Sequence, residues 1–131
     1  MVQLWKTFCL SVLDQSCVVW HSGLTEENRS DLERTQKTFA KLILEEDYVT
    51  YEKALLTLQL ETLESRRKTL SLSFAKRSLA DGKLRDLFPL TRKDHDMKTR
   101  KENKFHVTHA HTERYKKSPI ITMQKLLNES N

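Results

Sequence analysis

The chain contains few of the residues that interrupt helices, since only two glycines and two prolines occur in 131 residues. Leucine, lysine, glutamate and arginine, which favour helices, are frequent, so the composition predicts an all-α fold. Phosphate-binding loops and dinucleotide-binding turns need clustered glycines, whereas Gly23 and Gly82 are far apart in this sequence. The composition therefore excludes the common nucleotide-binding motifs.

Long apolar runs are also lacking. No segment approaches the ~18 consecutive apolar residues of a membrane-spanning helix, so we expect no membrane partner. The first twenty residues are rich in apolar side chains, but Lys6 and Asp14 interrupt them, which favours an amphipathic helix over a secretion signal. Cys9 and Cys17 lie too far apart on that helix for a disulfide. We therefore expect buried thiols in an intracellular protein, nuclear or cytoplasmic and not secreted.

The positive charge is concentrated in the C-terminal third. Residues 1–88 contain 13 Lys and Arg against 13 Asp and Glu, while residues 89–131 contain 10 against 5. Such an uneven distribution is typical of a folded domain that carries an interaction arm. The sequence predicts a helical domain over residues 1–88 and a basic, flexible tail over residues 89–131 with a short terminal helix.

Apolar residues that recur every three or four positions predict a small helical bundle of about four helices, followed by a basic, largely irregular C-terminal tail. Thr25 and Thr50 are the expected N-terminal caps of the second and third helices, and Ser118 is that of the terminal helix. The expected bounds are residues 3–21, 25–44, 51–58 and 62–80, with a terminal helix over 118–127. The expected core includes five large aromatic residues on the apolar faces: Trp5, Phe8, Trp20, Phe39 and Phe74.

Catalytic chemistry is not indicated. A polymerase transfers phosphoryl groups with carboxylates that hold two metal ions, and the sequence has no Asp-Asp pair. Asp94 and Asp96 lie among lysines and arginines in the expected flexible tail. No serine or cysteine lies in a recognisable nucleophile motif. We expect a noncatalytic chain, not an enzyme, that needs no cofactor.

Three histidines, His106, His109 and His111, lie close together, and His95 precedes them. Clustered imidazoles can bind zinc or copper, but their spacing matches no standard zinc finger. We interpret them as part of a solvated basic tail and expect no metal site.

The lysines and arginines suggest binding to nucleic acid, because phosphate contacts require accessible cationic side chains. Phe105 and Tyr115 are candidates for stacking on unpaired bases. Lys76 and Arg77 are further basic residues on the fourth expected helix. The alternative is that these charges only solvate the surface. The candidate nucleic-acid-binding residues are Arg66, Arg67, Lys68, Arg92, Lys93, Lys98, Arg100, Lys101, Lys104, Arg114, Lys116 and Lys117.

Several segments share their order and spacing with one protein family. They are residues 11–20 (SVLDQSCVVW), 32–37 (LERTQK), 60–67 (LETLESRR), 97–100 (MKTR) and 118–120 (SPI). Together they resemble the C-terminal thumb and post-polymerase segment of reverse transcriptases from non-LTR retrotransposons, the jockey-like RNA-directed DNA polymerases. The resemblance covers nearly the full chain.

The resemblance implies a helical thumb-like domain that grips nucleic acid, with roles for Arg66 and Arg67. The family's catalytic aspartates would lie upstream of Met1, so the implied function is that of a noncatalytic C-terminal fragment. Its expected partners are RNA, DNA or an RNA–DNA hybrid, together with the palm domain of a parent polymerase.

The alternative function is a helical protein–protein interaction module without a nucleic-acid role. A helical segment taken from a larger protein exposes apolar surface that once contacted its neighbour, and such surface recruits partners or self-associates. Trp5, Phe8 and Trp20 are the expected anchors of this contact.

Overall fold

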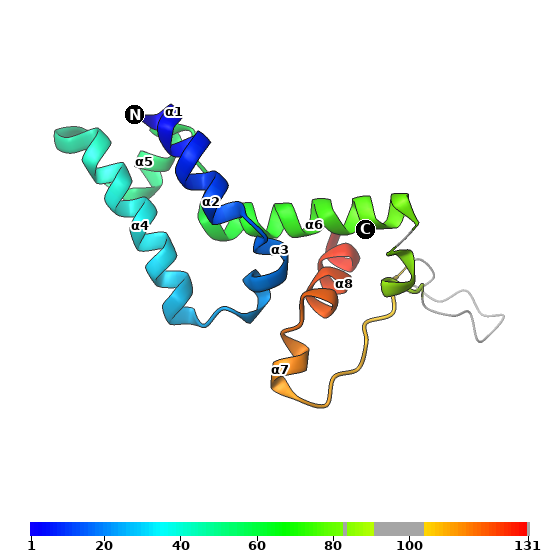
Figure 1. Ribbon diagram of the computed structural model, residues 1–131. Helices are drawn as coiled ribbons and strands as arrows, with labels where there is room; N and C mark the ends of the chain where they lie inside the picture. Colours follow the sequence, from blue (N-terminus) through cyan, green and yellow to red (C-terminus); the bar gives the residue numbers. More distant parts are fainter. Residues whose placement is uncertain (83, 91–103, 131) are drawn as a thin grey trace. The chain divides into compact units, whose positions relative to one another are not determined.

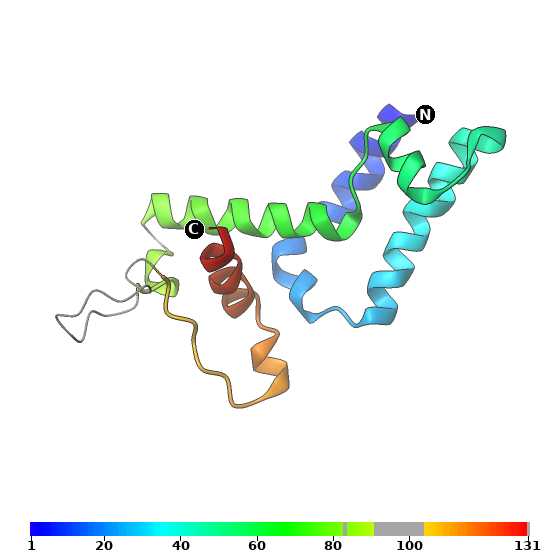
Figure 2. The same ribbon diagram turned by 180° about the vertical axis from the view of Figure 1, so that it is seen from behind.

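The computed structural model describes residues 1–82, 84–90 and 104–130 (Figures 1 and 2). Helices dominate these ranges and no strand is present in them, apart from one isolated bridge between Leu90 and Phe105. The all-α prediction is confirmed, although the helical segments outnumber the four that we expected. Within the described ranges, no helix is both long and apolar enough to cross a membrane.

The chain divides into two compact units. Unit 1 comprises residues 1–17 and 24–69, and unit 2 comprises residues 18–23 and 70–131. The expected boundary at residue 88 is therefore not where the structure divides the chain. Instead the chain passes from unit 1 to unit 2 within α6 (Leu63–Asp81).

The remaining elements have the following bounds. Unit 1 also contains α1 (Val2–Leu4), a π-helical turn (Trp5–Cys9), α2 (Leu10–Asp14), α4 (Glu26–Leu44), a 3-10 turn (Glu45–Asp47) and α5 (Tyr51–Leu58). Helix α3 (Cys17–Trp20) begins at the boundary between the units. Unit 2 contains two 3-10 turns (His21–Gly23 and Arg85–Leu87), α7 (Glu113–Lys116) and α8 (Pro119–Ser130).

The capping predictions are confirmed for α4 and α5. The Thr25 hydroxyl accepts a hydrogen bond from the Asn28 amide at 3.2 Å, and α4 ends at Leu44 as expected. The Thr50 hydroxyl accepts in the same way from the Lys53 amide at 3.4 Å. These caps satisfy amides that have no partner inside the helix, which is why threonine fixes the first turn.

The first expected helix, residues 3–21, is interrupted. Ser16 has a φ of 53°, in the left-handed region, so the helical backbone stops after Asp14 and resumes at Cys17. For an L-residue other than glycine this conformation costs about 1 kcal/mol or more. No glycine or proline marks the break, so nothing local in the sequence revealed it.

We call the continuous helical segment of residues 2–14, from α1 through α2, the first helix. The core of unit 1 forms where the first helix meets α4 and α6. The Trp5 and Phe39 rings stack with their centroids 4.1 Å apart, and Leu10 and Leu63 are buried beside them. A second cluster contains Ala40, Ala54 and Leu58. The core prediction is confirmed for Trp5 but wrong for Phe8, which is 67% exposed, and Cys9 is exposed as well.

The core of unit 2 joins α6 to the C-terminal residues: Ala75, Phe88, Met123 and Leu127 are buried together, and Phe105 packs against them. Residues 104–130 thus belong to a folded unit rather than to an irregular tail. Residues 91–103 lie outside the described ranges. Phe74 is 37% exposed, contrary to prediction.

Two side-chain amides of α8 hold the preceding segment against the helix. Asn128 accepts a hydrogen bond from the Phe105 amide at 2.7 Å and donates to the Phe105 carbonyl at 3.0 Å. Gln124 accepts from the Thr108 amide at 3.0 Å and donates to the Leu87 carbonyl at 2.8 Å. Because the bonds to Phe105 and Thr108 satisfy backbone groups outside any helix, they order a segment that its polar composition led us to predict as irregular.

Candidate functional site

The three basic residues nominated on the first turns of α6 already have contacts within unit 1. Arg66 donates two hydrogen bonds to Asp14, from Nη2 at 2.7 Å and from Nε at 2.9 Å, and lies 3.7 Å from Glu61. The hydrogen bonds to Asp14 raise the pKa of Arg66. Lys68 lies 2.7 Å from Glu64. The carboxylates that neutralise these side chains would compete with phosphate for them.

Arg67 is 2% exposed and lies inside unit 1. Burial lowers the pKa of its guanidinium, while the nearby carboxylates of Glu33 and Glu64 act in the opposite direction. A side chain this inaccessible cannot reach a phosphate without a rearrangement of its surroundings. The resemblance to reverse transcriptases implies that Arg66 and Arg67 contact nucleic acid. In this structure Arg66 is paired with Asp14 and Arg67 is buried, so neither side chain is available for that contact.

Residues from three of the segments that carry the resemblance, 11–20, 32–37 and 60–67, contact one another within unit 1. Glu33, from residues 32–37, accepts a hydrogen bond from the Leu63 amide at 3.1 Å, and Gln36 donates to the Glu61 carbonyl at 2.8 Å. Asp14, from residues 11–20, forms the ion pair with Arg66. These motif residues connect the helices of unit 1, so their pattern serves the architecture of the unit.

Tyr51 completes this polar network. Its hydroxyl donates a short hydrogen bond to Glu33 and accepts one from Gln36 at 3.1 Å. Burial and the contact with Glu33 raise the pKa of the Tyr51 hydroxyl, because both disfavour a second negative charge beside the carboxylate. The Glu33 carboxylate in this network is thus engaged by Tyr51 and by the Leu63 amide and is not free to contact a substrate.

An open pocket of about 360 Å³ lies beside this network in unit 1. Three cations and three carboxylates line it, and Arg29 pairs with Glu26 at 3.0 Å. The charges balance, so the pocket does not attract an anion over a cation. Its charged lining residues are Glu26, Arg29, Glu33, Lys37, Glu64 and Arg67.

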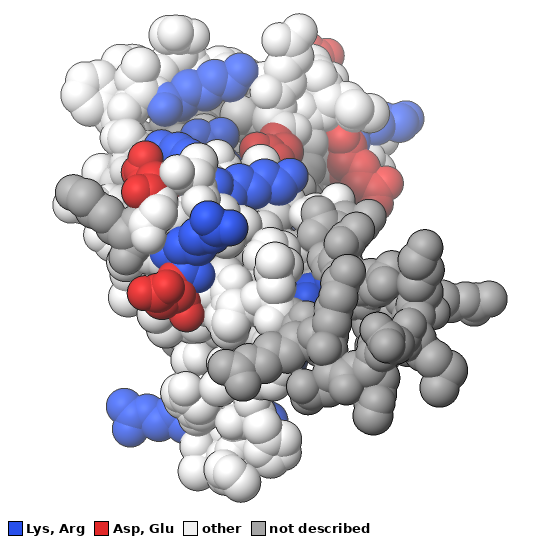
Figure 3. Space-filling model, turned by 90° about the vertical axis from the view of Figure 1, so that its right-hand side faces the viewer, with Lys and Arg blue, Asp and Glu red and all other residues white. Residues whose placement is uncertain are grey.

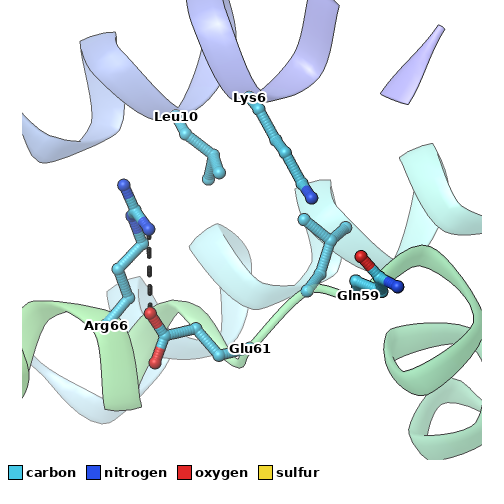
Figure 4. Close-up of a pocket in the computed structure, with 6 residues that line it drawn as sticks. Lys6, Leu10, Gln59, Glu61 and Arg66 are labelled. Carbon is cyan, nitrogen blue, oxygen red and sulfur yellow. Dashed lines mark ion pairs between the residues drawn. The ribbon is translucent and has the colours of Figure 1, made fainter. Parts of the chain in front are cut away.

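A second open pocket of unit 1, about 480 Å³ in volume, lies between the first helix and the start of α6. Figure 4 shows Lys6 and Leu10 facing Gln59, Glu61 and Arg66 across it. The dashed ion pair places the Glu61 carboxylate next to Arg66, one of the two cations that line the pocket. A nucleophile paired with a base is not present among these lining residues, so the pocket does not indicate catalysis.

Four accessible cations of unit 2 lie on α6 and at α7. Lys76 and Arg77 are exposed on α6, and Arg114 and Lys117 are exposed at α7 and its C-terminal cap. Within the described residues these four make no ion pair, whereas Lys116 pairs with Glu113. The sequence analysis identified Lys76 and Arg77 as basic residues of the fourth expected helix, but they are not among its candidate nucleic-acid-binding residues.

The other nominated residues have mixed positions. Lys104 is exposed. Phe105 is half-buried in the core of unit 2, so it is not a free stacking platform, while Tyr115 is 50% exposed. Five nominated basic residues lie outside the described ranges: Arg92, Lys93, Lys98, Arg100 and Lys101.

Charged side chains of both signs occur on the face drawn in Figure 3. Lysine and arginine side chains lie next to aspartate and glutamate side chains there, and the described part of this face has no uninterrupted basic surface. Binding to a polyanion through such a surface would rest on a few individual cations.

Histidine and cysteine do not form a metal site in the described part of the chain. No group of three or more His, Cys, Asp or Glu side chains is placed there to hold a metal ion. The rings of His109 and His111 contact each other edge to face with centroids 4.7 Å apart, and both side chains are exposed. His95 lies outside the described ranges.

The comparisons with known proteins found no relative. No family model matches the chain, and searches of curated proteins and of solved structures gave no match. The functional argument therefore rests on the residues and their geometry.

Proposed function

We propose that the protein is a noncatalytic, sequence-nonspecific nucleic-acid-binding fragment of a retrotransposon reverse transcriptase, and that unit 2 makes the contacts. The main observation in support of this binding is that Lys76 and Arg77 are exposed on α6 and form no ion pair with the described residues. Accessible and unneutralised cations are what a phosphate contact needs. The sequence segments whose order and spacing resemble that family support the assignment to a reverse transcriptase.

The charge of unit 2 supports the same proposal. Unit 2 contains 14 Lys and Arg against 7 Asp and Glu, a net charge of +7. A net positive unit attracts a polyanion over a range of about 10 Å at moderate salt, before specific contacts form. The expected ligand is RNA, DNA or an RNA–DNA hybrid, without preference for sequence.

The test compares matched charge removals in the two units. The double substitution Lys76→Gln and Arg77→Gln removes two open cations of unit 2, and Lys41→Gln with Lys53→Gln removes two exposed lysines of unit 1. Fluorescence anisotropy with a labelled RNA–DNA hybrid is measured at several salt concentrations. Each phosphate contact adds about 0.9 to the slope of log K against log salt, so the unit 2 variant should lose about 2 from that slope.

The unit 1 variant is the control and should keep the slope of the unmodified protein. Equal losses in both variants would show that only total charge matters, and no salt-dependent binding by the unmodified protein would reject the proposal. Deletion of residues 90–131 does not serve as a test, because it would remove Met123 and Leu127 from the core of unit 2.

A further inference from the structure

The three clustered histidines of unit 2 are all exposed, and the residues beside them explain why. They lie on an extended, non-helical stretch that leads to α7 (Figure 1). Phe105 packs against the core of unit 2 and Ala110 is 9% exposed, so both face inward. Neighbouring side chains on an extended backbone point to opposite sides. His106 next to Phe105 therefore faces solvent. His109 and His111, on the two sides of Ala110, face solvent for the same reason.

Hydrogen bonds fix the backbone on which these rings lie. Gln124 of α8 accepts a hydrogen bond from the Thr108 amide at 3.0 Å. The Thr112 hydroxyl accepts from the Tyr115 amide at 3.2 Å and caps α7. The Tyr115 carbonyl accepts from the Ser118 amide at 2.9 Å, which joins α7 to α8. Groups that are already ordered lose less conformational entropy when they bind a ligand, so the folding of unit 2 prepares these rings for binding.

Aromatic rings and cations lie close together along residues 106–117, which we call the ring segment. The rings of His109 and His111 contact each other edge to face with centroids 4.7 Å apart, and Tyr115 is 50% exposed on α7. Arg114 precedes Tyr115, Lys117 follows it, and both are exposed. The ring segment contains three Lys and Arg against one Glu, so it is basic. Exposed rings among cations are typical of surfaces that hold unpaired nucleotides, because each base offers a face for stacking and each linkage a phosphate.

The ring segment lies apart from the exposed cations of α6. Ala75 of α6 packs with Met123 and Leu127 of α8 in the core of unit 2. Figures 1 and 2 both show α7 at the other, N-terminal end of α8. A ligand on the ring segment therefore contacts a different part of unit 2 from a phosphate at Lys76 and Arg77.

We propose that the ring segment is a binding site for single-stranded nucleic acid. Tyr115 and the exposed histidines stack on unpaired bases, and Arg114 and Lys117 contact the phosphates. A base inside a duplex is already stacked on its neighbours, so only an unpaired base offers its face to these rings. This inference rests on the proposed binding of nucleic acid by unit 2 and adds the kind of strand and the place of contact.

The first experiment measures fluorescence anisotropy of the full chain with labelled oligo(dT), labelled oligo(U) and a labelled blunt-ended DNA duplex at several salt concentrations. Tyr115→Ala should weaken binding to both single strands by about 5- to 150-fold, the range for one stacked base, and leave binding to the duplex unchanged. The slope of log K against log salt should stay the same, because stacking releases no counterions. Tyr115→Phe keeps the ring and should keep the affinity.

Matched variants separate stacking from charge. Arg114→Gln with Lys117→Gln should lower the salt slope for the single strands by about 1.4, since each phosphate contact on a single strand adds about 0.7. Phe8→Ala removes a ring of unit 1 that is 67% exposed, and it should change neither affinity nor slope. Circular dichroism melting confirms that each variant folds.

The second experiment places the bases by NMR. The ring-proton resonances of Tyr115, His109 and His111 should move upfield when oligo(dT) saturates the chain, because a stacked base shields them. The ring protons of Tyr48, in unit 1, should not move. Equal changes at Tyr48 and Tyr115, or none at Tyr115, would contradict the proposed site.

Three results of the first experiment would overturn the inference. They are unchanged single-strand affinity in Tyr115→Ala, an equal loss for single strands and duplex, and a loss in Tyr115→Phe as large as that in Tyr115→Ala. If any of these occurred while Lys76→Gln with Arg77→Gln still lowered the salt slope for the RNA–DNA hybrid, the proposed function would stand without this site. Loss of single-strand binding in Tyr115→Ala alone, in a chain that does not bind the hybrid, would support this site and reject binding through α6.

Discussion

The two units use their cations differently. Unit 1 contains 9 Lys and Arg against 11 Asp and Glu, a net charge of −2, while unit 2 contains 14 against 7. In unit 1 the strongest basic cluster is neutralised or buried, since Arg66 contacts Asp14 and Arg67 is 2% exposed. In unit 2 Lys76 and Arg77 are exposed without an ion pair in the described residues. A cluster of basic residues in the sequence thus identifies a binding surface only once the residues that they contact in the folded chain are known.

The units are alike in one structural device. Each contains a buried glutamine that donates to a backbone carbonyl from a distant part of the sequence: Gln36 to Glu61 in unit 1 and Gln124 to Leu87 in unit 2. Both side chains are at most 1% exposed. A single amide can satisfy several polar groups at once, which lets each unit order a loop without additional secondary structure.

The largest effects should come from the apolar cores and show whether the units unfold independently. Leu63→Ala in unit 1 and Leu127→Ala in unit 2 remove side chains that are 1% and 2% exposed, and each should cost about 2–5 kcal/mol of unfolding free energy. Hydrogen exchange read by mass spectrometry shows where protection falls. If each loss remains in its own unit, the units are separate cooperative blocks.

A uniform loss of protection from either core substitution would break that comparison and make the chain one cooperative block. Leu56→Ala, at a position that is 80% exposed, is the control and should change the exchange of neither unit.

The buried glutamines should come next. Gln36→Ala leaves the Glu61 carbonyl without its side-chain donor, and Gln124→Ala does the same to the Leu87 carbonyl, so each should cost about 1–3 kcal/mol. Chemical denaturation gives the free energies. Gln124→Ala should also raise the exchange rate of the Thr108 amide, which donates to that side chain. An unchanged rate at Thr108 would show that the 104–108 segment is held by its other contacts, which include the hydrogen bonds between Asn128 and Phe105.

The pH dependence of the unfolding free energy should distinguish unit 1 from unit 2 at alkaline pH. The pKa of Tyr51 is higher in the folded chain than the ordinary value of 10.0, so the unfolded chain loses this proton first as pH rises. The stability due to this group is fully present below pH 10 and falls above it, by at most about 1.4 kcal/mol per pH unit. Tyr51→Phe should make the decline of stability above pH 10 less steep, as measured by denaturation midpoints. The exposed Tyr115→Phe in unit 2 is the control, and an identical slope in both variants would contradict the assignment to Tyr51.

The smallest effects should come from the ion pairs. Asp14→Asn removes the carboxylate that holds Arg66 in a pair whose side chains are 19% and 33% exposed, so solvent screening limits the cost to about 0.5–1 kcal/mol. Glu113→Gln removes the exposed partner of Lys116 in unit 2 and should have no measurable effect on the melting temperature. A larger loss from Glu113→Gln than from Asp14→Asn would reverse the comparison.

Asp14→Asn also bears on the proposed function. It releases the guanidinium of Arg66 from its strongest partner, and nucleic-acid affinity should rise slightly if that cation then reaches phosphate. Unchanged affinity would leave unit 2 as the source of the contacts.

Local features of the sequence were sufficient to predict α4 and α5 almost residue by residue. Thr25 and Thr50 cap helices through hydrogen bonds to amides three residues later, and the run of acidic residues after Leu44 disfavours continuation of α4. These interactions act within one or two helical turns, so the sequence alone contains them. The all-α class follows in the same way from the scarcity of glycine and proline.

The tertiary structure decided the features that depend on distant residues. The break at Ser16, the exposure of Phe8 and the ordering of Phe105 by Asn128 depend on which surfaces the folded units cover. Whether Arg66 is paired or free depends on Asp14, which lies 52 residues away in the sequence. The sequence itself determined where helices begin and how much charge each part carries, because these are local or additive properties. Only the packed chain determined which apolar face is buried and which cation is free, because burial and ion pairing require partners that folding brings together.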